Sequence, residues 1–118
     1  MDRVPLAEAL RNRDVVLRAF VGADGRLASI PSKHAKRLVI LDHLARGFEP
    51  GHRYPELEVN RILRAAHDDV AALRRYLVEE GFLSREAGVY WRSGGTVDDP
   101  TADGDQPEGD QRDGDASR

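Results

Sequence analysis

Cysteine is absent from the 118-residue sequence, which excludes disulfides, thiolate catalysis and zinc sites of the cysteine type. Long hydrophobic runs are absent too, because the most apolar run, residues 38–41, is far shorter than the roughly 20 residues that span a bilayer. Residues 1–14 carry scattered charges and lack the apolar core and the small-residue cleavage site of a signal peptide. We therefore expect a soluble, cytoplasmic protein with no membrane contact.

Motifs of catalysis are also missing. The sequence has no glycine-rich phosphate loop, no G-x-S-x-G and no paired histidine and carboxylate motif. Its histidines do not fall at a metal-ligand spacing such as i, i+4; they are His34, His43, His52 and His67. We therefore expect a protein that is not an enzyme and that uses neither a metal nor a cofactor.

The charge is distributed unevenly along the chain. The net charge is −3, but residues 1–95 carry 16 basic and 13 acidic side chains, whereas residues 96–118 carry 2 basic and 8 acidic ones. The second segment is rich in Asp, Gly, Pro and Gln and has almost no apolar residue that could offset the entropy of ordering. This pattern predicts one domain at residues 1–95 and a disordered acidic tail at residues 96–118. The tail is interpreted either as a solvating appendage or as an electrostatic competitor of DNA.

The sequence of the first half of the domain predicts helices and one short strand. Residues 5–10 are expected to form a short helix, and Asp14 to cap a second helix or extended run. A turn at Asp24 and Gly25 precedes a predicted strand at residues 26–30. Ser32 is expected to cap a central helix, residues 33–45, whose broad apolar face contains Leu38 and Leu41.

The second half predicts two more helices and a hairpin. A short extended piece at Arg53 and Tyr54 precedes a helix over residues 56–66, and Asp68 is expected to cap a helix over residues 69–80. Strands at residues 82–85 and 89–92 then enclose a turn with Gly88. This order predicts an α+β, mainly α fold: a winged helix-turn-helix with a C-terminal two-stranded wing, additional N-terminal helices and a short strand.

Four stretches carry a family resemblance: "DGRL..IP.K" at residues 24–33, "Y.E.EVN..L" at 54–63, "D....LRR.LV..G.L.R" at 68–85 and "G.YWR" at 88–92. Together they resemble the domain of unknown function 2087 (DUF2087) family, over roughly residues 15–93. The resemblance implies a winged-helix protein of the kind often described as a transcriptional regulator. It brings no mechanism with it.

The predicted helix 69–80 is the candidate DNA-reading element. Its buried face is expected to hold Val70, Leu73 and Leu77, so that Arg75 points outward, and two small residues leave room in a major groove; these are Ala71 and Ala72. The alternative is an ordinary solvated face on which Arg74 lies over the core toward Glu56 or Glu58. The same alternative explains the motif "Y.E.EVN" by helix capping and an Arg74 partner, instead of a polar ligand site.

Further cations extend the predicted surface. Arg85 and Arg92 on the wing would lie along phosphates, or else would stabilise the hairpin by pairing with Glu86. Arg61 and Arg64 are expected to point outward from helix 56–66 and to add phosphate contacts, the alternative again being a solvated face. The only tryptophan, Trp91, is expected to be a buried anchor beneath the wing.

Two hypotheses of function follow from the sequence. The first is a transcriptional regulator that binds double-stranded DNA through helix 69–80 and the wing at residues 82–92. Binding to two-fold DNA sites would need a homodimer, formed through helix 33–45 or the N-terminal segment. The second is a non-catalytic winged-helix module that binds a protein partner and not DNA, which the modest charge of the domain and the acids near helix 69–80 favour.

Overall fold

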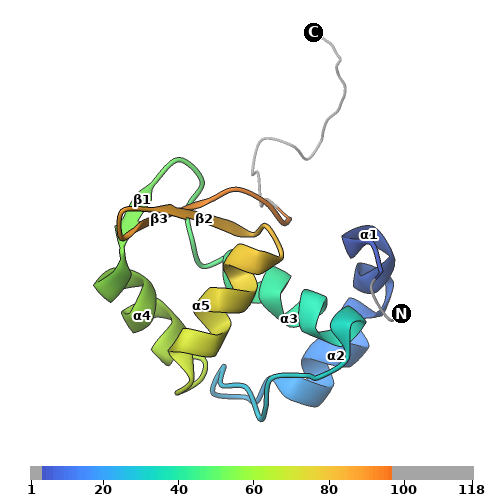
Figure 1. The fold of residues 1–118 in the computed structure, drawn as a ribbon. Coiled ribbons are helices and arrows are strands. Elements are labelled where there is room, and N and C mark those ends of the chain that lie inside the picture. Colours follow the sequence, from blue (N-terminus) through green and yellow to red (C-terminus); the bar gives the residue numbers. More distant parts are fainter. Residues whose placement is uncertain (1–3, 97–118) are drawn as a thin grey trace, which may run out of the picture.

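The computed structural model describes residues 4–96, and the predicted acidic tail lies outside the described residues except for Thr96. The described part is mainly helical, with a small sheet placed across one end of α4 and α5 (Figure 1). Its elements are α1 Leu6–Ala9, the 3-10 turn η1 Leu10–Asn12, α2 Arg13–Phe20, α3 His34–Ala45, β1 Arg53–Pro55, α4 Glu56–Arg64, α5 Val70–Glu79, β2 Leu83–Glu86 and β3 Val89–Arg92. Within residues 4–96, every helix is too short or too polar to cross a bilayer.

The sheet has three antiparallel strands in the order β1-β3-β2, and not the two strands that were predicted. The extended piece expected at Arg53 and Tyr54 is β1, which pairs with β3 so that Tyr54 lies opposite Tyr90. A hairpin of two strands alone is marginally stable, and β1 supplies hydrogen-bonding partners for the second edge of β3. The sequence showed the extended piece but not its pairing, which joins residues almost 40 positions apart.

The strand predicted at residues 26–30 does not form. Only an isolated bridge between Val21 and Leu27 is present there. The backbone N–H of Leu27 donates to the carbonyl of Ala66, 2.8 Å away, so this segment is tied to the end of the α4 region and has no neighbouring strand. The Leu27 side chain is buried in the core.

Helix α3 is enclosed by the rest of the described chain. Leu38, Val39, Ile40 and Leu41 follow one another along it, and all four are buried. A helix that is apolar around most of its circumference belongs inside a core, and here α1, α2 and α5 pack against α3. The apolar face of α3 that was expected to support a homodimer is therefore used within the monomer and is not available to a second copy.

Three helix starts differ from their predicted positions. Helix α2 begins at Arg13, so Asp14 lies in its first turn and does not cap it. Asp69, and not Asp68, caps α5, since its side chain accepts a hydrogen bond from the Ala72 backbone N–H at 3.1 Å. Asp68 instead accepts from the Arg26 guanidinium at 2.9 Å. Helix α3 begins after Lys33 without a side-chain cap, so Ser32 does not have the predicted capping role.

The chain after β3 is packed into the domain as far as Thr96, one residue beyond the predicted boundary. The Thr96 backbone N–H donates to Oδ1 of Asp42, a fully buried carboxylate on α3, at 2.6 Å. Gly95 has a φ of 87°, and a Cβ at this position would stand 2.8 Å from the Phe82 ring. A side chain here would therefore meet both a strained backbone and an occupied site.

Candidate nucleic-acid interface

The exposed face of α5 presents the residues that were predicted to read DNA. Ala71 and Arg75 are exposed, and Ala72 is half-buried. The Arg75 guanidinium lies 3.9 Å from the Glu79 carboxylate one helical turn away. Both side chains are more than half exposed, and such pairs contribute only about 0.3–0.5 kcal/mol, so Arg75 is readily released to another anion.

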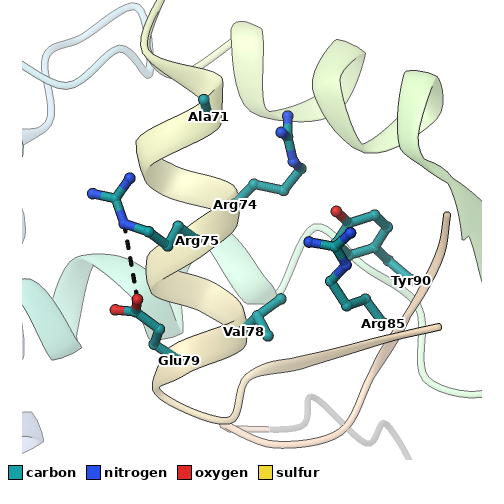
Figure 2. A pocket seen from close by; sticks show the side chains of 7 residues that line it. All are labelled: Ala71, Arg74, Arg75, Val78, Glu79, Arg85 and Tyr90. Carbon is teal, nitrogen blue, oxygen red and sulfur yellow. Dashed lines mark ion pairs between the residues drawn. The ribbon is translucent and has the colours of Figure 1, made fainter. Parts of the chain in front are cut away.

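A hollow lies between α5 and the hairpin, and we call it the α5–hairpin hollow. It is lined by Ala71, Arg74, Arg75, Val78, Glu79, Arg85 and Tyr90 (Figure 2). Its volume is about 140 Å³, whereas pockets for small-molecule ligands measure roughly 300–1,000 Å³. The hollow is therefore too small for a cofactor. Arg74 is engaged by Asn60 and Glu56, so Arg75 and Arg85 against Glu79 leave an excess of one positive charge, which suits a single anionic group.

The paired arginines of α5 leave the helix on opposite sides. In Figure 2, Arg75 extends toward Glu79, whereas Arg74 extends toward α4 and the side of the hairpin. Arg74 donates to Oδ1 of Asn60 at 2.6 Å and lies 3.8 Å from a Glu56 oxygen. The alternative expectation for Arg74, that its side chain lies over the core toward Glu56, is confirmed. It also accounts for two residues of the "Y.E.EVN" motif.

Glu56 is itself fixed by the sheet. The hydroxyl of Tyr90, a buried residue of β3, donates to its Oε1 at 2.9 Å. Burial, and then the hydrogen bond and charge of Glu56, raise the pKa of Tyr90 above its usual value. Residues of α4, α5 and β3 thus meet in one polar cluster behind the hollow: Glu56, Asn60, Arg74 and Tyr90.

The two wing arginines that were predicted together lie in opposite environments. Arg85 is exposed and its guanidinium lies 5.6 Å from the centre of the Tyr90 ring. Arg92 is buried, and it donates to the carbonyls of Ala45 and Phe48 at 2.9 and 3.1 Å and also to Gly94 and Thr96. The prediction of Arg92 as a surface contact is therefore wrong. Its guanidinium is buried and hydrogen-bonded to backbone carbonyls, including that of Ala45, the last residue of α3.

Strand register accounts for the burial of Arg92, but not for the exposure of Arg85, which lies opposite Tyr90 on the same face of the hairpin. The turn residues Ala87 and Gly88 both have positive φ, 54° and 80°, as a two-residue type I′ hairpin requires. This turn places Arg92 opposite Leu83, and residues opposite each other share a face. Because Leu83 belongs to the core, Arg92 faces inward; the turn and Leu83 were the signals that could have found it.

The alternation of inward and outward side chains along β3 also corrects the prediction of which aromatic residue is buried. Tyr90 is the buried anchor, and Trp91 is only half-buried, so the predicted role of Trp91 is wrong. Trp91 points to the other face, where the Arg53 guanidinium lies 4.3 Å from its ring centre.

Arg61 and Arg64 are exposed, as predicted, but they lie on the outer face of α4 and not in the α5–hairpin hollow. With Leu57, Asn60 and Ala65 they border a separate shallow depression. Arg61 is paired with Glu58, one turn before it in α4. The predicted cations therefore form two neighbouring areas, one on α5 and the hairpin and one on α4.

Histidines and carboxylates do not gather into a metal site anywhere in residues 4–96. His34 is buried and lies 3.1 Å from both oxygens of Glu80, at the end of α5. Its Nδ1 accepts from the Val4 backbone N–H at 3.3 Å, and its Nε2 is the ring nitrogen that faces Glu80. This histidine ties the N-terminal segment to α3 and α5.

Comparison with known proteins gives one match. Residues 26–92, more than half of the chain, match the family described as an uncharacterized protein conserved in bacteria, DUF2087. The chain belongs to this family. The matched residues include β1, α4, α5 and the hairpin, and so they include the whole of the hollow. No curated protein and no solved structure matches the chain.

Proposed function

We propose that this member of the DUF2087 family is a cytoplasmic winged helix-turn-helix protein that binds double-stranded DNA and regulates transcription. In this proposal α4 and α5 are the helix-turn-helix, α5 enters the major groove, and β2 and β3 are the wing. The order α3-β1-α4-α5-β2-β3 and the strand order β1-β3-β2 are compatible with that fold.

The observation that carries the proposal is the exposed face of α5. Arg75 stands there beside the small Ala71, and Arg85 approaches from the hairpin across the hollow. In a helix-turn-helix, such positions read base edges from the recognition helix and contact phosphates from the wing. Arg61 and Arg64 on α4 would add phosphate contacts next to it. Arg92 has no part in the proposed contact.

A protein-binding module that does not contact DNA is the second candidate. Leu57 is 83% exposed at the start of α4, and Asp68, Asp69 and Glu79 place negative charge along α5. An exposed leucine beside paired charges is more typical of a protein contact than of a phosphate contact.

Binding to mixed genomic DNA fragments at low and raised salt separates the two candidates. We expect the purified chain to bind, and Arg75→Ala to lose about 1–3 kcal/mol of binding free energy to a selected fragment. Arg85→Ala should weaken all fragments alike and should reduce the salt dependence by about one phosphate contact. Arg18→Ala, an exposed arginine of α2 that does not line the hollow, is the matched control.

A chain ending at Val97 tests whether the acidic segment competes with DNA, and it keeps Thr96 in place. If neither chain binds DNA at low salt, the DNA-binding proposal fails and the protein-binding candidate takes its place. If binding is specific but Arg75→Ala does not change it, α5 is not the reading element.

A further inference from the structure

We propose that Glu56 and Asn60 of α4 are positioning residues that hold Arg74 away from bound DNA, so that the chain binds DNA more weakly than its arginines would allow. This inference rests on the proposed function, and it adds to it an internal restraint on affinity. Its physical basis is a competition: the same guanidinium faces an internal acceptor pair and an open, cationic hollow.

Arg74 has one hydrogen-bond acceptor and one ion-pair partner inside the domain. One guanidinium nitrogen donates to Asn60 at 2.6 Å and the other lies 3.8 Å from Glu56. Glu56 cannot swing away freely, because the buried Tyr90 hydroxyl holds its other oxygen at 2.9 Å. Glu56 is therefore held in position independently of Arg74, so little side-chain entropy of Glu56 is lost when the two pair.

Arg74 nevertheless borders the hollow that the proposed phosphate would enter. It lines the hollow together with Arg75 and Arg85, and 21% of its side chain is exposed. A long arginine side chain can redirect its head group without moving the helix. With Glu56 paired to it, however, Arg74 adds almost no net charge to the hollow, so Arg75 and Arg85 remain as the effective cations.

The consequence is that Arg74 could make a third phosphate contact, after Arg75 and Arg85, but is kept from it by its internal partners. Weakening the internal acceptors should release Arg74 toward DNA. One additional phosphate contact makes the fall of log K with log salt steeper by about 0.9, and at low salt it raises affinity roughly three- to tenfold. A purely structural role of Glu56 and Asn60 would not produce a steeper salt dependence.

A double-mutant cycle on non-specific duplex DNA tests the proposal. Glu56→Gln and Asn60→Leu are each measured with Arg74 present and in the Arg74→Ala background. We expect both variants to bind three- to tenfold more tightly, with the steeper salt slope, only when Arg74 is present. Asn60→Leu changes no charge, so its effect cannot come from a general change of potential. Glu86→Gln, which removes a carboxylate from β2 near Arg85 without touching Arg74, is the matched control.

Two further measurements keep the result interpretable. Thermal unfolding verifies that each variant is folded, and if Glu56→Gln is not, Asn60→Leu alone completes the cycle. An NMR titration of Tyr90 verifies that Glu56→Gln has removed the charge beside its hydroxyl, because the pKa of Tyr90 should then be raised less, and by burial alone.

The outcomes separate the inference from the proposed function. Equal gains with and without Arg74, or a gain as large in Glu86→Gln, would assign the effect to overall charge and would overturn the inference alone. Unchanged or weaker binding in both acceptor variants would do the same. If the wild-type chain does not bind duplex DNA at all, the proposed function fails, and this inference fails with it.

Discussion

Two arginines of one hairpin show that the environment of a residue determines its role. Arg85 and Arg92 have the same chemistry and lie on paired strands, yet one is solvated and the other donates to the carbonyls at the end of α3. A cation at a helix C-terminus satisfies orphan carbonyls and interacts favourably with the helix dipole. Arg92 therefore stabilises the fold, whereas Arg85 is exposed on the surface.

Replacing Arg92 should destabilise the fold. We expect Arg92→Leu to lower the free energy of unfolding by about 3 kcal/mol, because several buried carbonyls would lose a charged donor. Urea unfolding followed by circular dichroism measures the change. Arg85→Ala is the control and should stay within about 0.5 kcal/mol of wild type. Equal effects of the two substitutions would contradict the buried role of Arg92.

Tyr90 predicts a dependence of stability on alkaline pH. Its pKa in the folded state is raised, mainly by burial and then by Glu56, above the usual 10.0. The folded state therefore keeps the phenol proton where the unfolded state loses it, and stability should fall as the pH rises above about 10. Tyr90→Phe should flatten the fall in stability in a profile measured from about pH 8 to about pH 11. An unchanged slope would show that Tyr90 does not contribute.

At the scale of elements, local patterns located the helices more reliably than they located their caps. The apolar spacing predicted α4, α5 and the central helix α3, and the described structure contains all three. The cap of α5 moved from Asp68 to Asp69 because Arg26, distant in sequence, engages Asp68 instead. The strand at residues 26–30 is reduced to a single bridge between Leu27 and Val21, and the Leu27 backbone N–H donates to the carbonyl of Ala66.

The hairpin turn offers a test at this scale. Ala87 has a φ of 54°, a left-handed conformation that costs a residue with a Cβ about 1–2 kcal/mol. Asn tolerates this conformation better, and Asn-Gly is the preferred pair in type I′ turns. We expect Ala87→Asn to raise the free energy of unfolding by about 0.5–1 kcal/mol in urea titrations. Gly88→Ala should lower it, and the opposite order would show a different turn geometry.

At the scale of the whole molecule, the segment after β3 closes the domain. Thr96 satisfies one oxygen of the buried Asp42 carboxylate, and Gly94 and Thr96 supply carbonyls to Arg92. These contacts join the end of the described chain to α3, in the middle of the core. Thr96, the last described residue, therefore belongs to the packed domain.

Truncation tests this closure. A chain ending at Ser93 should be less stable than one ending at Val97 by on the order of 3 kcal/mol, because a buried carboxylate and a buried guanidinium would both lose partners. The comparison is made by thermal and urea unfolding of the two truncated chains. Equal stability would show that residues 94–96 do not close the domain.

The sequence by itself determined the helical spacing, the hairpin turn, the small-residue face of α5 and the family, because each of these depends on neighbours within a few positions or on a long run of matched residues. It also singled out Arg75 as exposed and Arg74 as leaning toward Glu56. Only the tertiary structure decided that β1 joins the hairpin, that Tyr90 and not Trp91 is buried, and that Arg92 faces inward. These outcomes depend on strand pairing and on backbone acceptors far away in the sequence, which local periodicity does not report.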